Sequence, residues 1–417
     1  MNLAKTSILS FLATMIRLLS GLVINKAIAI IIGPSGLAFI GQFQNAQNMI
    51  RTFSQGGINA GVTKYTSEFS RDMSVIPEIW SASFKITLFF SVTASLIMII
   101  FSEYLAMLIF KSKDYSYIFM LFGVTVTLSS LNQMLLSILN GLKEIKNFIR
   151  INIFQSLFSL IFTTTYIVVF GLNGALIALV TNQSIIFFVI LWFLRRHSRI
   201  KLTAFLEKFS FFWGSKLASY SLMALTSSSL VPLSLILVRE YIGNTLSWDD
   251  AGYWQAMNYI STMYLMVITT ALSTYFLPRL SELKSGSEIK SELLNGYKLI
   301  GPIVFILTIA VYFSKELIVW VLFTDDFRSM LILFKWQLIG DFMKIISWLL
   351  AYVMLAKAMT KVYIISEISF SIVYVLASYY FIDNYGLIGA SYAFAFNYTL
   401  YLFVMLFIVS NYIKKEV

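Results

Sequence analysis

The residues that could do chemistry in this chain are polar side chains inside otherwise apolar segments. Four of them recur on one face of a predicted helix, at spacings of four, three and four residues: Gln44, Asn48, Arg51 and Gln55. Such a stripe must face protein or water, because a charge at the centre of a membrane helix costs at least ~2.5 kcal/mol. A packing seam of amide hydrogen bonds is the alternative. A seam does not need a guanidinium group, so the stripe favours a water-filled cavity.

Further cations lie in the first apolar segment. Arg17, near its middle, and Lys26, nearer its end, are both candidates for binding an anionic substrate in the cavity. Alternatively, Lys26 snorkels to the membrane surface. The guanidinium groups of Arg17 and Arg51 suit the oxygens of a phosphate or pyrophosphate. An ion pair with an acid competes with this interpretation, but no acid is evident at matching depth in the first two spans. An uncharged stripe in the second half adds two residues to the predicted cavity: Gln255 and Asn258.

Three ionisable residues of the second half are candidates for ion coupling: Asp341, Lys344 and Glu367. Asp341 and Lys344 are three residues apart, so they could form a neutralising intrahelical pair. Alternatively, Asp341 exchanges a proton or binds a cation together with Glu367. The sequence leaves both interpretations open.

Enzyme chemistry has no support in the sequence. There is no GxxxxGK followed by Ser or Thr, so nucleotide hydrolysis is not expected. No paired catalytic carboxylates, nucleophile–base arrangement or metal-ligand cluster stands out, and the absence of cysteine excludes thiolate metal sites and disulfides. We therefore expect a protein that is not an enzyme and that has neither cofactor nor metal.

The elements that must position these residues are membrane helices. Hydrophobic residues make up 59% of the 417 and charged residues 12%, against about half and a quarter in soluble proteins. Because a bilayer offers no hydrogen bonds to the backbone, helices are the expected spanning structure. We predict an all-α polytopic protein with about twelve spans: 6–32, 36–57, 79–101, 116–139, 147–170, 172–194, 216–241, 251–276, 299–313, 329–356, 361–381 and 385–409. Segments 102–114 and 314–326 are predicted to be short interfacial pieces.

The net charge of +11 is an orientation signal and not a nucleic-acid signature, because Lys and Arg collect in short loops on one side of the predicted spans. Loops 143–150, 195–208 and 279–290 carry most of these cations, and the opposite loops carry acids such as Asp249 and Asp325. Both termini are therefore predicted to be cytoplasmic.

The sequence also repeats weakly. The pattern Gly171-Leu-Asn-Gly174-Ala175 recurs as Gly386-Leu-Ile-Gly389-Ala390, an offset of 215. We predict two six-helix lobes, 1–200 and 216–417, joined by a basic cytoplasmic linker, 201–215. An even number of spans in each lobe implies a parallel pseudo-two-fold axis along the membrane normal, with a substrate path between the lobes.

Several motifs resemble a known family. They are Gly33-Pro34-Ser35-Gly36-Leu37, the run from Gly57 to Tyr65, Leu277-Pro278-Arg279-Leu280-Ser281, and Trp336–Asp341 with Lys344. They resemble Wzx-type flippases for O-antigen and enterobacterial common antigen units, in the polysaccharide transporter family of the multidrug/oligosaccharidyl-lipid/polysaccharide exporter superfamily. The likeness spans nearly the whole chain.

The resemblance implies an alternating-access transporter of the bacterial inner membrane. It would move undecaprenyl-pyrophosphate-linked oligosaccharide to the periplasmic leaflet, and membrane lipids would be its surrounding partners. A polymerase and a chain-length regulator of the same pathway are candidate partners. An ion-coupled multidrug extruder of the same superfamily is the main alternative, but we expect it to place acids where this chain places Arg17 and Arg51. A membrane polysaccharide polymerase would need a sizeable outer loop, and every predicted outer loop is short.

Overall fold

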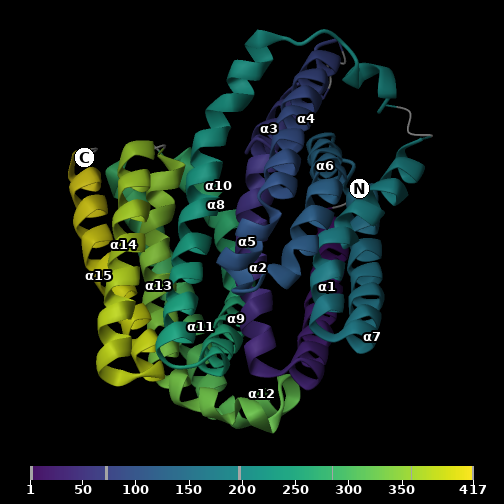
Figure 1. Ribbon diagram of the computed structural model, residues 1–417. Coiled ribbons are helices and arrows are strands. Elements are labelled where there is room, and N and C mark those ends of the chain that lie inside the picture. The colour runs from purple at the N-terminus through teal and green to yellow at the C-terminus, as the bar shows by residue number, and fades with distance from the viewer. Residues whose placement is uncertain (1–2, 71–73, 196–198, 284, 358, 416–417) are drawn as a thin grey trace. The chain divides into compact units, whose positions relative to one another are not determined.

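The computed structural model describes residues 3–70, 74–195, 199–283, 285–357 and 359–415. Within these ranges every regular element is a helix and none is a strand (Figure 1). The chain divides into two compact units: unit 1 is Met1–Ile32 with Phe39–Pro232, and unit 2 is Gly33–Ala38 with Leu233–Val417. The prediction of an all-α membrane fold is confirmed.

Unit 1 is a helical bundle with a continuous apolar core. Helix α7 packs against α1 and α6, and α6 packs against α4. The elements are α1 (Leu3–Ile31), α2 (Gly33–Ser54), α3 (Asn59–Glu68), α4 (Ile76–Ile100), α5 (Ser102–Phe110), the 3-10 helix η1 (Lys113–Tyr115), α6 (Ser116–Gly141), α7 (Ile145–Leu194), the 3-10 helix η2 (Leu202–Phe205) and the first part of α8 (Phe211–Thr245).

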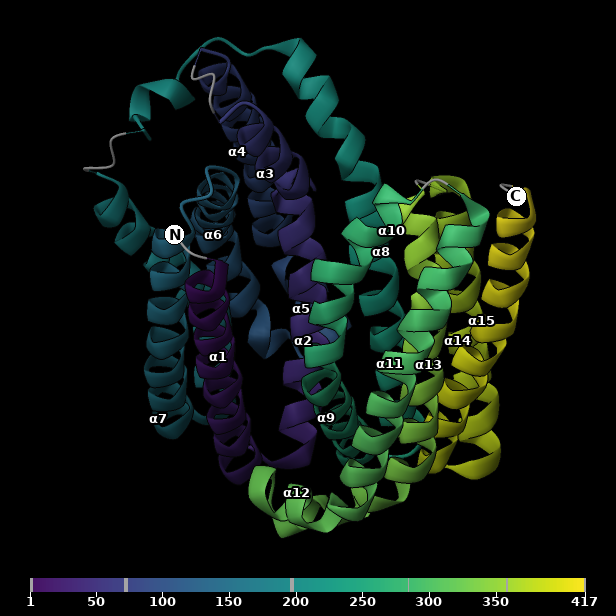
Figure 2. The same ribbon diagram turned by 180° about the vertical axis from the view of Figure 1, so that it is seen from behind.

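Unit 2 is also a helical bundle with an apolar core. Helix α15 packs against α13 and α14, and α11 packs against α13 (Figure 2). The elements are the rest of α8, α9 (Trp248–Ala271), the π-helix η3 (Leu272–Phe276), α10 (Leu277–Glu282), α11 (Gly286–Phe313), α12 (Lys315–Leu322), the 3-10 helix η4 (Asp325–Leu333), α13 (Phe334–Ala356), α14 (Thr360–Tyr385) and α15 (Leu387–Lys415).

The number of membrane crossings agrees with the prediction of about twelve. Nine stretches of the described chain are long and apolar enough to cross a membrane. One of them covers most of α7, whose 50 residues are interrupted at Gly171 and suffice for two crossings. Helices α2 and α9 are absent from the nine although each is long enough, because they carry the polar stripes. The segments predicted to be interfacial contain the short helices α5 and α12, and their place at the membrane surface stays a prediction.

Glycine positions show that the repeat extends to local geometry. Gly171 and Gly386 both have positive φ, 56° and 65°, which glycine tolerates because it lacks a Cβ atom. A Cβ at Gly174 would lie 1.8 Å from the carbonyl oxygen of Tyr166, and one at Gly389 would meet a backbone carbonyl at 2.1 Å. The kink inside α7 of unit 1 and the turn between α14 and α15 of unit 2 therefore depend on glycine in the same way.

The Gly33–Leu37 motif has a structural explanation inside unit 2. The first turn of α2 leaves backbone N–H groups without helical partners, and the Ser35 amide donates to Asp249 Oδ1 of α9 at 3.0 Å. A Cβ at Gly252 would lie 2.0 Å from the Pro34 carbonyl oxygen. The motif thus fixes the start of α2 against α9.

The structure differs from the prediction at two helix boundaries. Helix α11 begins at Gly286 and not near 299, because a capping box of Ser285 and Glu288 starts a charged first section that hydropathy does not detect. Helix α8 extends from Phe211 to Thr245, and the division between the units falls at Pro232 within it.

The segment predicted as a basic linker, 201–215, packs on unit 1. Phe205 stacks on Trp80 of α4 with ring centroids 5.7 Å apart. Ser81 and Lys85, also on α4, donate to the carbonyl oxygen of Glu207. Phe205 and Trp213 of this segment therefore belong to the apolar core of unit 1, while most of its other described residues are exposed.

Candidate functional site

Unit 1 contains a polar cavity of about 660 Å³. Among the described residues that line it, Arg17 is the single charged side chain, and no acid is present. Most of the other polar lining groups are carboxamides: Asn59, Gln133, Asn140, Asn152, Gln155 and Gln183. Serine and threonine side chains, Phe148 and a few small or aliphatic residues also line it.

Four helices present a face to this cavity, as the spacing of the lining residues shows, and α3 contributes Asn59, Ala60 and Thr63. Residues three, four or seven apart lie on one side of a helix. Helix α1 contributes Arg17, Ser20, Gly21 and Ile24; α6 contributes Gln133, Leu136, Ser137 and Asn140; α7 contributes Asn152, Gln155, Ser156 and Ser159. Packing of α7 against α1 and α6 brings these polar faces together.

The amides of the cavity differ in their hydrogen bonds. Asn59 donates to Gln55 Oε1 at 2.5 Å, while its own Oδ1 is buried without a partner. Asn152 donates to the carbonyl oxygen of its own helix at Phe148, at 2.8 Å. The side chains of four others make no hydrogen bond among the described residues: Gln133, Asn140, Gln155 and Gln183. These amides are available to a ligand.

Arg51, predicted to pair with Arg17, holds α2 against α7. Its Nη2 donates to the carbonyl oxygen of Leu179 at 2.9 Å, and Gln47 Nε2 donates to the same oxygen at 2.8 Å. The Nε of Arg51 is buried without a partner. The lining of the cavity thus includes Arg17 but not Arg51.

The other residues of the predicted α2 stripe are at least partly accessible. Asn48 is exposed, and Gln44 and Gln55 are half-buried, while the fully buried polar side chains of α2 lie on another face. Lys26 is half-buried on α1. Three of the four stripe residues therefore keep accessible surface, whereas Arg51 packs against α7, and the water-filled cavity along the stripe stays a prediction.

In unit 2, Asp341 is completely buried. Its Oδ2 accepts hydrogen bonds from Ser261 Oγ at 2.7 Å and Tyr264 Oη at 2.8 Å, both on α9, while its Oδ1 has no partner. One turn earlier on α13, both amide atoms of Gln337 are buried without a partner. Three buried polar atoms on this part of α13, one from Asp341 and two from Gln337, therefore make no hydrogen bond.

Lys344 does not pair with Asp341. No ion pair joins them within the described ranges, and the ammonium group lies instead among aromatic rings, 5.0 Å from Trp348 and 5.4 Å from Tyr398. Such cation–π contacts stabilise a charge away from water. Half-buried Glu367, on α14, interacts electrostatically with Lys344.

Arg239 was missed by the sequence analysis. It is 1% exposed, donates to Gln255 Oε1, and lies 5.3 Å from the ring of Trp254. Gln255 is therefore engaged by an arginine, whereas Asn258 donates to the carbonyl oxygen of Trp254 at 3.0 Å. Arg239 lies near the end of an apolar segment, directly before Glu240. In the sequence it therefore looks like a surface residue at the end of a helix, and no signal distinguishes it as buried.

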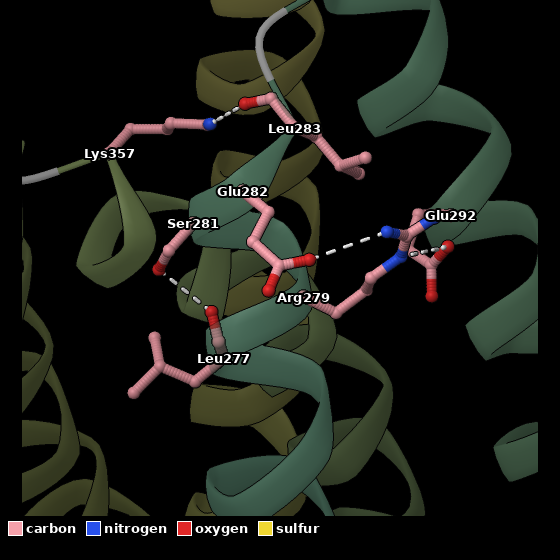
Figure 3. Close-up of polar contacts among 7 residues, drawn as sticks. All are labelled: Leu277, Arg279, Ser281, Glu282, Leu283, Glu292 and Lys357. Carbon is pink, nitrogen blue, oxygen red and sulfur yellow. Dashed lines mark hydrogen bonds and ion pairs between the residues drawn. The ribbon is translucent and has the colours of Figure 1, made fainter.

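The Leu277–Ser281 motif is a structural junction (Figure 3). Arg279 lies 3.7 Å from the carboxylate of Glu292 on α11 and also contacts an acid in its own helix. Lys357, after α13, donates to the carbonyl oxygen of Leu283. The motif therefore connects α10 with its neighbours in unit 2.

Comparison with known proteins identifies the class. Residues 13–332 match the family of polysaccharide biosynthesis proteins. This match covers most of the chain, and the chain belongs to that family.

Individual relatives narrow the comparison. The chain is 26% identical over 401 residues to the Lipid III flippase of Escherichia coli (strain K12), with 96% of each chain covered, and the same values hold for the Lipid III flippase of Shigella flexneri. The resemblance seen in the sequence is confirmed at this level.

Solved structures share the fold. An inward-facing multidrug resistance MATE family transporter of the MOP superfamily matches with a TM-score of 0.83 at 13% identity, covering 96% of this chain and 95% of the other. A MOP superfamily transporter from Pyrococcus furiosus matches with a TM-score of 0.74 at 13% identity, covering 99% and 95%. The chain is thus a multi-pass membrane protein with the fold of this transporter superfamily.

Proposed function

We propose that this protein flips an undecaprenyl-pyrophosphate-linked oligosaccharide from the cytoplasmic to the periplasmic leaflet of the bacterial inner membrane. It does so by alternating access, with both termini in the cytoplasm, and it does not act as an enzyme. Membership of the polysaccharide biosynthesis family and similarity to two Lipid III flippases support this proposal. The glycan is an O-antigen or common-antigen repeat unit, and a polymerase and a chain-length regulator are its expected pathway partners.

The observation that carries the proposal is the charge of the unit 1 cavity. Its lining includes Arg17 and six carboxamides but no acid. A cationic drug would be repelled by Arg17 and would find no carboxylate, whereas an anionic glycolipid headgroup gains a charge-assisted hydrogen bond. This chemistry disfavours multidrug extrusion for this chain, although a multidrug resistance transporter shares its fold.

Coupling to an ion gradient is part of the proposal and is supported by Asp341. A coupling ion can drive transport only if it binds the two conformational states with different affinities. The unpartnered Oδ1 of Asp341, beside the unpartnered amide of Gln337, offers oxygen atoms that a proton or a small cation could occupy. Lys344 interacts electrostatically with both Asp341 and Glu367. A change in the charge of Asp341 would therefore be felt by Lys344 and, through it, by Glu367.

A complementation experiment tests the proposal. We expect the chain to restore surface glycan in a bacterial strain that lacks its Lipid III flippase and makes the lipid-linked glycan normally. Tolerance to cationic drugs should not change in the same strain. Restored drug tolerance without surface glycan would replace flipping by multidrug extrusion.

A further inference from the structure

The amides of the unit 1 cavity form a surface that the pyrophosphate alone does not explain. Arg17, on α1, is the cation of the lining, whereas the amides without partners lie on α6 and α7: Gln133, Asn140, Gln155 and Gln183. A carboxamide carries no charge, so these two walls offer a phosphate only weak attraction. They call for a ligand of another kind.

A carboxamide offers an acceptor oxygen and two donor hydrogens side by side. Because four such groups face one cavity, the ligand that satisfies them must present donors and acceptors in alternation. The hydroxyl and amide substituents of sugar residues do so, whereas phosphate oxygens only accept and an aliphatic chain does neither.

The size and the remaining lining fit a glycan. A volume of about 660 Å³ lies within the ~300–1,000 Å³ of small-molecule sites. Such sites combine apolar surface with a few oriented polar groups, and Phe148 supplies an aromatic surface beside Asn152 and Gln155. A site for a polyprenyl tail would be apolar throughout, which this cavity is not.

We infer that the cavity of unit 1 is a subsite for the uncharged sugar residues of the transported glycolipid, which its carboxamides bind while Arg17 binds the adjoining anionic group. This inference rests on the proposed flippase function and adds the part of the substrate that is recognised. It implies that the cavity contributes to selection by the glycan and not only by the lipid pyrophosphate.

The test uses the full-length protein in vesicles and two lipids: undecaprenyl pyrophosphate bearing three N-acetylglucosamine residues, and undecaprenyl pyrophosphate bearing none. Gln133→Leu, Asn140→Leu and Gln155→Leu should each slow flipping of the glycan-bearing lipid about tenfold and leave the glycan-free lipid within twofold of wild type. The matched control is Asn384→Leu at the exposed end of α14, where the amide only contacts its own helix. It should change neither rate.

The outcomes separate the two claims. If the cavity variants slow both lipids equally, or neither, the sugar subsite is wrong while flipping stands. If wild-type protein moves neither lipid, the proposed function itself fails and the subsite fails with it. A Leu variant that loses the wild-type melting curve is replaced by Gln155→Met or Gln133→Met, which keep the length of the side chain and remove the amide without adding a charge. The same selective loss is required of them.

Discussion

Replacing Arg17 by Gln should weaken binding of the anionic headgroup while preserving the fold. Arg17 is exposed on the cavity face of α1 and is the charged group of the lining. A hydrogen bond to a charged group contributes about 1.5–3 kcal/mol, and 1.4 kcal/mol is a factor of ten in affinity. The dissociation constant of the headgroup should therefore rise about 10- to 150-fold. Glutamine retains a donor and much of the length, so the loss reports the charge.

Isothermal titration of the purified protein in nanodiscs can measure this change. The ligand is a short-chain prenyl pyrophosphate that bears a glycan and stays soluble. Arg17→Lys should retain more affinity than Arg17→Gln if charge dominates, because lysine keeps the charge but loses the fork of the guanidinium group. Arg328→Gln, which removes an exposed pair with Asp325, is the control. Affinity of Arg17→Gln equal to wild type would refute the role of Arg17.

Three further predictions follow from individual contacts. Arg51→Ala removes the hydrogen bond to Leu179, which in a membrane protein averages about 0.6 kcal/mol. The melting temperature should therefore fall only slightly, and surface glycan display should persist because Arg51 does not line the cavity; loss of display at wild-type abundance would contradict this placement and give Arg51 a headgroup role. Asp341→Asn should abolish the response of reconstituted flipping to an imposed pH or sodium gradient but leave slow downhill flipping; a wild-type response would make Asp341 purely structural. Gly174→Ala places a Cβ 1.8 Å from a backbone carbonyl, so the strain of overpacking, about 1–3 kcal/mol, should lower the melting temperature by several degrees. Gly301→Ala, whose Cβ meets only a side chain at 3.9 Å, should not, and equal melting of both variants would contradict the close packing.

Much of the fold was predictable because hydropathy and glycine patterns are local properties of the chain. The spans follow from runs of apolar residues, and the recurrence of Gly171 as Gly386 anticipates two turns with the same backbone geometry. The start of α11 was not predictable from hydropathy, since its first section is charged and begins at a capping box. Residues 201–215 look like a basic linker, but their packing depends on Trp80, which is distant in sequence.

The candidate site was predictable only in part, because helix periodicity gives the face of a residue and not its partner. Arg17 could be recognised as a deep cation, and the structure places it at the cavity. Arg51 was recognised by the same reasoning, but its contact with Leu179 depends on how α2 meets α7. The amides of α6 and α7 were missed because their spacing acquires meaning only when these helices face α1. Arg239 was missed because its partner Gln255 lies on another helix.

The most direct measurement of the central claim is flipping by the purified wild-type protein in sealed vesicles. Fluorescently labelled undecaprenyl pyrophosphate bearing an oligosaccharide is placed in both leaflets, and its accessibility to a membrane-impermeant quencher or glycan-cleaving enzyme is followed over time. A cationic dye is tested in parallel vesicles. We expect the protein to accelerate equilibration of the glycolipid between leaflets and to leave the distribution of the dye unchanged. Acceleration of the dye alone, with the glycolipid moving as in protein-free vesicles, would contradict a lipid-linked glycan flippase.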